Sequence, residues 1–453
     1  MIVLKFGGTS VGSVENFKKV AEIVNEVNED RIVVLSAMSG VTNTLVEIAG
    51  CLSNGDAERA FPLIENLDAK YRQVVRDLMP DVGVQEKTFD FLDDRNELLN
   101  DLARKAFSPS SEKEILAQGE LVSTHLFHYY LEAINEPNEL LPALGFMRID
   151  RNGEPDGERI RQDLRKLLKS EPGHRIYITQ GYICRNHSNG IDNLRRGGSD
   201  YSASLIGAAA GAKQIQIWTD IDGMHNNDPR YVANTFSVGE LSFDEAAELA
   251  YFGAKILHPQ SIIPAKENNI PVLLKNTFRP DSPGTLIHQG AEVKSIRAVA
   301  AKDNITAIKI KSYRMLMAYG FLKNVFEVFE HHKTAIDMIT TSEVAVSLTI
   351  DDTSKLQEIK KGLQGFGTIE VDADLSIICI AGDISQNKKG ITASIFNSLK
   401  DIPIRMISYG GSNYNLSFLV KTSDKLAVLN LLNQGLFKEL GKRELGEREL
   451  VLT

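Results

Sequence analysis

The sequence has little of the material from which secreted, membrane-spanning and zinc-binding proteins are built. Only three cysteines occur in 453 residues, far apart, with no CxxC pair and no Cys/His ligand spacing among them. Neither a disulfide framework nor a zinc site is therefore predicted. No stretch approaches the roughly 18 apolar residues of a membrane-spanning helix, and the apolar run at the start is too short for a signal peptide. We expect a cytoplasmic protein without a membrane partner.

Basic clusters and several familiar motifs are also missing. The chain carries 51 Lys and Arg against 60 Asp and Glu, a net charge of −9, so nucleic acid is not an expected partner. It contains no P-loop motif GxxxxGKS/T, no HRD and DFG pair, no GxGxxG fingerprint and no HExxH motif. These absences exclude the enzyme classes that the motifs define. We expect no metal ion held by the protein's own side chains.

The first 290 residues have the pattern of a layered α/β sheet. Hydrophobic residues make up 43% and charged residues 25% of the chain, as in soluble globular proteins, and the length suggests about three units. Short β-branched runs alternate with longer helical patterns, which is typical of α/β folds. Residues 56–170 are expected to be largely helical. Strands are predicted over residues 2–6, 31–36, 175–179, 214–219 and 271–275.

A pattern in the last third of the chain occurs twice. Segments 320–326, 336–340 and 346–348 are echoed about 70 residues later by 390–396, 404–408 and 416–418. Two small α+β modules are therefore predicted. The stretch 277–300 contains Pro280, Pro283 and Gly284 and is expected to form the edge of the first unit and a linker. We expect a catalytic domain over 1–290, a linker over 291–303, and modules over 304–382 and 383–453.

The strongest local signal is a glycine turn between a predicted strand and a predicted helix. It reads KFGGTS over residues 5–10, and Ser13 is a plausible N-cap of the helix. Glycines let the backbone approach a phosphate closely, and a helix N-terminus offers unpaired N–H groups. Lys5 adds a full positive charge against a transferring phosphoryl group. The alternative, a tight turn with an edge lysine, remains open.

A second glycine turn, RRGGSD over residues 195–200, precedes a helix of small residues with Ser199 as its expected cap. Two such turns in one sheet suggest two ends of one anionic site. Arginine suits the bidentate binding of a carboxylate. Asp200 has a simpler alternative, since an acidic residue in the first turn complements the helix dipole.

A third candidate region begins at the end of the strand predicted at 214–219. The sequence WTDIDG over 218–223 and NDPR over 227–230 forms a polar loop, where α/β sheets usually bind ligands. Ser242 and Glu245 form a capping box at the start of a helix that is expected to end near Tyr251 to Lys255. Lys255 is the functional candidate there, with a solvated lysine as the alternative.

These segments together resemble the aspartate kinases, specifically the monofunctional lysine-sensitive kind, in the amino-acid kinase superfamily. The matching segments occur in the family's order and cover nearly the whole chain. They are KFGGTSV (5–11), GE (119–120), QG (180–181), RGGSDY (196–201), WTD (218–220), DPR (228–230), FGAKILHP (252–259) and ITTSE (339–343). The resemblance implies a three-layer αβα fold with a mostly parallel sheet, followed by two βαββαβ ACT modules that bind amino acids and build homodimers.

The resemblance also implies a reaction: ATP and L-aspartate give 4-phospho-L-aspartate and ADP, the first step toward lysine, threonine and methionine. A side-chain carboxylate has a reference pKa of about 3.9 and is already an ionised nucleophile at neutral pH. Catalysis then consists of positioning and charge neutralisation. This fits a sequence in which we find no Ser/His or Cys/His arrangement. A kinase for another substrate and a non-catalytic amino-acid sensor are the alternatives.

The family's functional residues carry over to matching positions of this chain. Lys5 and Asp200 would be catalytic, with Asp200 orienting the lysines. Aspartate would be bound by Thr42, Glu120, Arg196, Gly197, Gly198 and Ser199. ATP, with Mg2+ bound mainly through its phosphates and water, would be bound by Lys5, Gly7, Gly8, Ser10, Thr219, Asp220, His225, Asp228, Arg230 and Lys255. His225 stands where relatives often have Tyr.

The resemblance further implies an L-lysine effector site in the first module. Its expected residues are Met315, Gly320, Phe321, Leu322, Asp337, Thr341, Ser342 and Glu343. Met317 and Ala318 depart from a His-Ser pair that lysine-sensitive bacterial enzymes often carry. Acidic side chains suit the cationic end of an amino acid. Feedback inhibition by lysine is predicted; in the alternative, the modules serve only as a dimer interface.

Overall fold

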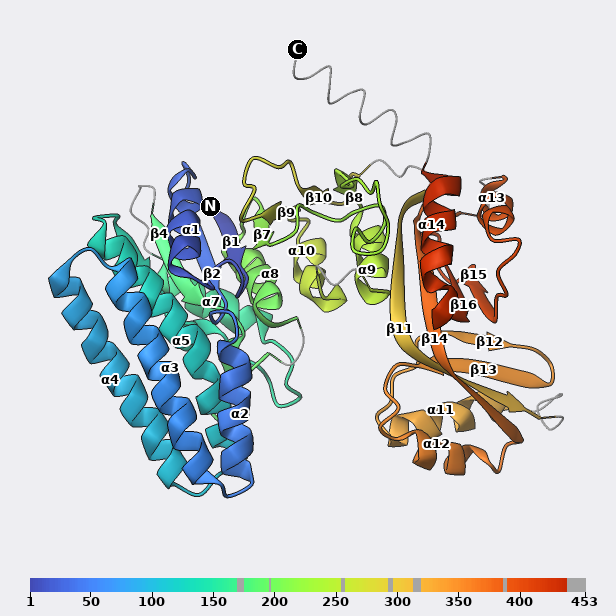
Figure 1. Cartoon of the computed structure of the whole chain (residues 1–453), viewed down its shortest axis with the longest axis horizontal. Helices are drawn as coiled ribbons and strands as arrows, with labels where there is room; N and C mark the ends of the chain where they lie inside the picture. Colours follow the sequence, from blue (N-terminus) through green and yellow to red (C-terminus); the bar gives the residue numbers. More distant parts are fainter. Residues whose placement is uncertain are drawn as a thin grey trace, which may run out of the picture. The chain divides into compact units, whose positions relative to one another are not determined.

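The computed structural model describes residues 1–168, 175–194, 197–253, 257–291, 296–312, 319–385 and 389–437 (Figure 1). The chain divides into two compact units. The first comprises Met1–Met224, Gly239–Phe243 and Ile256–Ala291. The second comprises His225–Val238, Asp244–Lys255 and Glu292–Thr453. The second unit therefore includes two segments of the expected catalytic domain in addition to the whole tail.

The first unit is built on an eight-stranded, mostly parallel sheet in the order β3-β4-β2-β1-β7-β9-β10-β8. The five predicted strands are confirmed to within one residue at each end: β1 (Ile2–Phe6), β2 (Arg31–Leu35), β4 (Ile176–Gln180), β7 (Ile215–Thr219) and β9 (Val272–Asn276). These five pair in parallel. The edges are formed by β3 (Asn138–Leu140) and β8 (Glu240–Leu241), and β10 (Thr285–Ile287) lies between β8 and β9, antiparallel to β9. A hairpin of β5 (Ile183–Arg185) and β6 (Ile191–Asn193) lies outside this sheet.

Helices cover both faces of this sheet. Helix α1 (Val14–Asn25) follows β1 and is capped by Ser13, as predicted. Four long helices lie side by side in Figure 1: α2 (Val41–Ser53), α3 (Ala57–Leu78), α4 (Val82–Arg104) and α5 (Pro109–Ala133). Together with α7 (Gly157–Leu167), they confirm that 56–170 is largely helical. On the other face, α8 (Gly198–Ala210) packs against β1, β2 and β7. Short helices α6 (Ala143–Phe146), η1 (Pro259–Ile262) and α10 (Ile263–Glu267) complete the unit.

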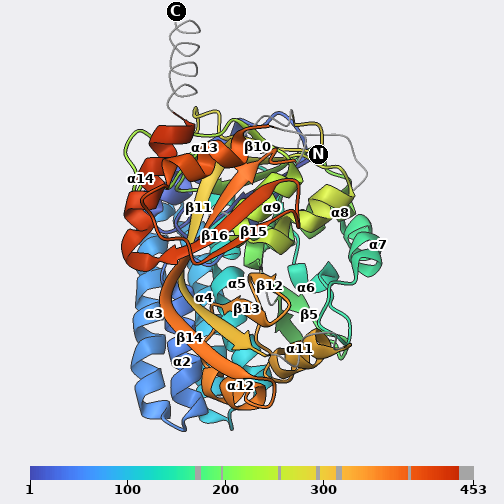
Figure 2. The ribbon, with the colours of Figure 1, turned by 90° about the vertical axis from the view of Figure 1, so that its right-hand side faces the viewer.

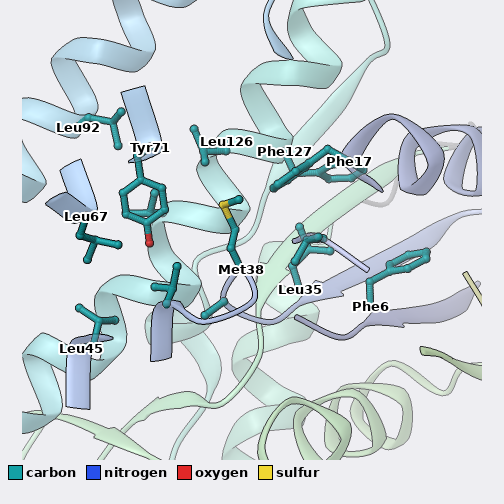
Figure 3. Packing of buried hydrophobic residues seen from close by; sticks show 14 of the residues in the cluster. Phe6, Phe17, Leu35, Met38, Leu45, Leu67, Tyr71, Leu92, Leu126 and Phe127 are labelled. Carbon is teal, nitrogen blue, oxygen red and sulfur yellow. The ribbon is translucent and has the colours of Figure 1, made fainter. Parts of the chain in front are cut away.

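The alternation of side chains along β1 decides which residue faces which layer. Leu4 and Phe6 are fully buried in the core that α1 to α5 build over one face, where Phe17 and Phe127 pack near them (Figure 3). Since successive side chains of a strand point to opposite faces, Lys5 points toward α8. The strand thus carries an apolar face for the core and a single charged group for the other layer.

The second unit contains a six-stranded antiparallel sheet in the order β12-β13-β11-β14-β16-β15 (Figure 2). Two strands are long: β11 (Ile296–Lys311) and β14 (Thr368–Gly382). The others are β12 (Ile339–Thr341), β13 (Ala345–Ile350), β15 (Met406–Tyr409) and β16 (Asn415–Lys421). The helices are α9 (Phe243–Tyr251), which ends where expected, α11 (Phe321–His331), α12 (Leu356–Leu363), α13 (Ile391–Ser398) and α14 (Lys425–Leu436), with a short turn η3 (Thr422–Asp424).

The two long strands correct the expected boundaries of the modules. Residues 296–302, expected to be linker, pair with 377–382, whereas 307–311 pair with 368–372. Register shifts separate the two halves, and Asn304 and Asp374 there adopt positive φ angles of 61° and 57°. The first half of β11 and the second half of β14 contribute Val299, Ile378 and Ile380 to a core shared with α13 and α14. The second module therefore begins inside the expected linker and includes residues placed in the first module.

The core of the first module is separate. It joins the second half of β11 to α11, α12 and β13 through Ile308, Val325, Phe329, Leu348 and Ile359. The two repeats thus each have a core of their own beneath their helices, but they share both long strands, and a further cluster joins Met338 of the first to Leu419 of the second. Among the described residues, no helix is long and apolar enough to cross a membrane.

Candidate active site

The loops that follow β1, β2 and β4 meet at one edge of the first unit's sheet and surround a pocket of about 560 Å³. Carboxyl ends of parallel strands are where α/β sheets bind ligands. Five predicted residues line this pocket: Gly8, Thr42, Glu120, Gly198 and Ser199. The pocket is also lined by residues that the sequence did not mark as site residues, among them Thr9, Ser39, Asn43 and Tyr182. Ser39 and Tyr182 each lie three residues after the end of a predicted strand, so their position in the chain was an available signal.

Lys5 and Asp200 form an ion pair, with 2.6 Å between Lys5 Nζ and Asp200 Oδ1. Their side chains are only 11% and 18% exposed. Lys5 comes from the central strand β1, and Asp200 lies in the first turn of α8, on the face toward which Lys5 points. Asp200 therefore has a specific partner, and a role that is limited to complementing the helix dipole does not account for its position.

The first glycine turn is tightly packed. A Cβ atom on Gly8 would lie 2.8 Å from the Ala37 carbonyl oxygen, a distance that real Cβ atoms do not show. The Gly8 carbonyl in turn accepts a hydrogen bond of 3.1 Å from the Ser39 N–H. Gly7 donates its N–H to the Trp218 carbonyl at 3.2 Å, which links the turn to the end of β7. The turn is therefore packed directly against the loop after β2.

The second glycine turn differs in one detail from the prediction. The N-cap of α8 is Gly197, with φ 70°, and not Ser199, because a glycine in this left-handed conformation starts the helix earlier. Gly198 also has positive φ, at 48°. Ser199 instead packs tightly against Gly181, where a Cβ would lie 2.3 Å from the serine hydroxyl oxygen. Arg196 lies outside the described residues.

Glu120 is the buried acid of the pocket. It is 5% exposed, and its Oε1 accepts a hydrogen bond of 3.2 Å from the Ala37 N–H. The Ser123 hydroxyl donates to the Ser36 carbonyl at 2.8 Å, so α5 is fastened to the same loop. Burial raises the pKa of Glu120 to about 7, against the smaller opposing effect of the Ala37 hydrogen bond. A cationic ligand would therefore be needed to hold this carboxylate fully ionised at neutral pH.

The predicted nucleotide residues of the first unit lie at the ends of β1 and β7. Thr219 donates its hydroxyl to Asp220 Oδ1 at 3.0 Å and accepts the Ile221 N–H at 3.3 Å, which shapes the loop. Ser10 is fully buried, and its hydroxyl lies 2.7 Å from that of Thr277. The Ser10 side chain therefore stabilises the glycine turn from within, whereas its predicted contact with ATP would have to come from its backbone.

His225, Asp228 and Arg230 lie in the second unit. Arg230 forks onto the carboxylate of Asp228, with Nε to Oδ1 at 2.9 Å and a second nitrogen to Oδ2 at 2.6 Å. The His225 ring nitrogen Nδ1 lies 3.2 Å from the Thr235 hydroxyl. The adjacent Asn227 donates to the Leu429 carbonyl on α14. Lys255 lies outside the described residues.

The predicted effector residues are dispersed over the first module. Thr341 and Ser342 line a pocket of about 620 Å³ with Lys309, Lys311 and Glu370. Asp337 is not among the residues that line this pocket; its side chain is 2% exposed and bonded to Lys302. Gly320 is the N-cap of α11, followed by buried Phe321 and half-buried Leu322, and Glu343 is exposed. Met315 lies outside the described residues, as do Met317 and Ala318.

Comparison with known proteins identifies the class. Residues 1–276 match the model of the amino acid kinase family, and residues 378–436 match an ACT domain. The first match covers more than half of the chain and coincides with the unit that carries the glycine turns. The chain therefore belongs to the amino acid kinase family.

Its relatives narrow this assignment. The chain is 35% identical over 450 residues to lysine-sensitive aspartokinase 3 of Escherichia coli, covering 97% of this chain and 99% of that protein. It superposes on the crystal structure of E. coli aspartokinase III with aspartate and ADP at a TM-score of 0.83, with 34% identity and 96% and 100% coverage. The TM-score against the same enzyme with lysine and aspartate is 0.79, at 34% identity and 96% and 99% coverage. The chain is a member of the aspartokinase branch of the family.

Proposed function

We propose that this chain transfers the γ-phosphoryl group of ATP to the side-chain carboxylate of L-aspartate. The observation that carries the proposal is the pocket in which buried Glu120 lies opposite the glycine turns, next to the Lys5–Asp200 pair. Such a pocket offers an acid for an ammonium group and backbone N–H groups for anions. The E. coli relative was solved with aspartate and ADP, which supports the same pair of ligands.

The chemistry asked of the protein is positioning and charge neutralisation. The aspartate carboxylate attacks the γ-phosphorus, and the bond to the β,γ-bridging oxygen breaks, so no proton has to be removed from the nucleophile. Lys5 neutralises charge on the transferred group, and Asp200 fixes the direction of the lysine side chain. Glu120 takes the ammonium of the substrate, Arg196 its α-carboxylate, and Thr42 and Ser199 contribute hydroxyls to the same pocket.

ATP enters this proposal as its Mg2+ complex. No cluster of three or more acidic, His or Cys side chains that could hold a metal exists in the part of the chain that the structure describes. Mg2+ commonly binds through substrate phosphates and water, so the ion would arrive with the nucleotide. The residues proposed to bind the nucleotide are Lys5, Gly7, Gly8, Ser10, Thr219, Asp220, His225, Asp228, Arg230 and Lys255.

Regulation by L-lysine is the second part of the proposal. It is supported by the ACT modules and by the E. coli relative, which was solved with lysine bound. The physical requirement is two global states, of which lysine binds the less active one better. We also propose a homodimer formed through the ACT modules, to be tested by sedimentation velocity.

The deciding experiment is ADP formation by purified protein with ATP, Mg2+ and either L-aspartate or L-glutamate, with and without lysine, threonine or methionine. Aspartate-dependent turnover that lysine alone suppresses is the expected result. Turnover with glutamate but not aspartate would establish another kinase of the family. Lysine binding in a calorimeter without any turnover would instead establish a non-catalytic sensor.

A further inference from the structure

Helix α9 ends on the sheet of the ACT modules, to whose unit it belongs. Phe252, directly after the helix, is buried in a cluster with Ile305, Met338 and Leu419. Gly253 has φ 120°, and a Cβ there would lie 2.0 Å from the Ala301 carbonyl oxygen. At Gly253 the chain is thus packed directly against strand β11, without space for a side chain.

Beside this contact, Tyr251 meets a cluster of charged groups in which Asp337 is buried and Asp351 is exposed. The Tyr251 hydroxyl donates to Asp337 Oδ1 at 3.0 Å. The Lys302 ammonium lies 2.6 Å from the same oxygen and 2.9 Å from Asp351 Oδ2, and 4.8 Å from the centre of the Tyr251 ring. Tyr251 therefore joins α9 to Asp337, which lies 86 positions later in the chain.

The cluster of Asp337, Asp351 and Lys302 has a net negative charge, so it can accept one more cation. Two carboxylates face one ammonium, and Asp337 Oδ2 is buried with no hydrogen-bond partner within the described parts of the chain. An unsatisfied buried carboxylate oxygen is costly, so an added donor is favoured. Among the predicted effector residues, Asp337 is the one suited to receive an effector's ammonium from this side.

We propose that the Tyr251 hydroxyl is the contact through which occupation of Asp337 is transmitted to α9 and to Lys255, the predicted nucleotide residue that follows it in the sequence. This inference rests on the proposed lysine regulation. An effector ammonium on Asp337 Oδ2 neutralises part of the carboxylate charge that holds the Tyr251 hydroxyl and the Lys302 ammonium at Oδ1, and this weakens the attachment of α9. Because coupling between two sites needs a physical connection between them, loss of the Tyr251 contact weakens the response of nucleotide binding to lysine.

The test is the full-length Tyr251→Phe variant, which removes only the hydroxyl. The matched control is Tyr414→Phe, the same change in the second module just before β16. KM for ATP, KM for aspartate and kcat are measured with and without lysine, and lysine binding is measured separately by calorimetry. Loss of one hydrogen bond to a charged group is expected to raise KM for ATP about threefold to tenfold without lysine. KM for aspartate is expected to stay within about twofold.

Added lysine is expected to raise KM for ATP by the same factor in the wild type and in the Tyr414→Phe control. In Tyr251→Phe the factor is expected to be less than half as large. An unchanged lysine response of KM for ATP in Tyr251→Phe would overturn the inference. An equal rise of both KM values would overturn it as well, since that indicates general loosening of the fold. A wild-type enzyme that turns over aspartate but does not respond to lysine refutes both the effector and this link, whereas absent turnover refutes the proposed reaction itself.

Discussion

Lys5 Nζ and Asp200 Oδ1 lie 2.6 Å apart, although the two residues are almost 200 positions apart in the chain. Lys5 is on the central strand β1 and points toward α8, and Asp200 lies in the first turn of α8. The pair lies where the two glycine turns converge, so a transferring phosphoryl group would meet a lysine whose direction is already set.

Replacing Lys5 tests this arrangement directly. Lys5→Met is expected to lower kcat by about 10³-fold, because a charge aimed at the transition state is lost. Asp200→Asn retains the lysine but removes the ion pair that orients its side chain, and should lower kcat by about tenfold to a hundredfold. Steady-state rates with saturating ATP and aspartate measure both, and circular dichroism verifies the fold. Lys213→Met, an exposed lysine paired with Glu29, is the control and should retain full activity.

The pKa of Glu120 leads to a prediction about pH. With a pKa of about 7 in the empty pocket, only the ionised fraction attracts the ammonium of aspartate. KM for aspartate is therefore expected to fall about tenfold between pH 6 and pH 8. Initial rates across this range test it, and Glu120→Gln should have a high KM that no longer varies around pH 7.

The raised pKa of Glu120 also predicts how the stability of the fold depends on pH. Aspartate binding is expected to improve as pH rises, whereas stability is expected to fall. The folded-state pKa of Glu120 is raised above its ordinary value of 4.5, so the folded protein retains a proton that the unfolded chain loses between these two values. The free energy of unfolding therefore falls as pH rises through this window. Glu120→Gln should be more stable than the wild type at pH 8, by about 1–3 kcal/mol, and equally stable at pH 4. Denaturant melts at both pH values measure this; a less stable variant at pH 8 would contradict the burial argument.

Gly8 and Gly50 offer a matched pair of substitutions. Gly8→Ala would force a Cβ against the Ala37 carbonyl, so the turn must shift away from the loop after β2. We expect kcat/KM for aspartate to fall by about 10²-fold. Gly50 lies inside α2 with nothing within 4 Å of an added Cβ. Gly50→Ala should raise stability by about 0.5–1 kcal/mol without changing activity. Kinetics and thermal melts of the two variants separate a site effect from a helix effect.

The corrected module boundary is testable with two valines. Val299 belongs to the core with α13 and α14, and Val325 to the core with α11 and α12. Each Val→Ala change should cost about 2 kcal/mol locally. Hydrogen exchange of the full chain should show faster exchange in α14 and β16 for Val299→Ala, and in α11 and β13 for Val325→Ala. If residues 291–303 were only a linker, Val299→Ala would leave exchange in α14 unchanged.

Much of the first unit followed from local pattern. Its five central strands are short apolar runs between turn signals, and Ser13 caps α1 through a contact three residues away. These features depend on neighbours in the chain, which is why sequence reasoning reached them. Ser199 was misjudged as a cap because the left-handed conformation of Gly197 cannot be seen in residue type alone.

The order of the residues was sufficient for the parallel sheet, the two glycine turns that bound a pocket, and a tail of two related modules. Tertiary structure alone decided that 296–302 pairs with 377–382, because strand pairing depends on contacts about 80 residues apart. It also decided the pKa of Glu120, which depends on how completely α5 and the loop after β2 exclude water. Tertiary structure likewise decided the contact of Tyr251 with Asp337, because the two residues are 86 positions apart in the chain. A side chain's partners and its solvent are properties of the packed chain, and no local spacing encodes them.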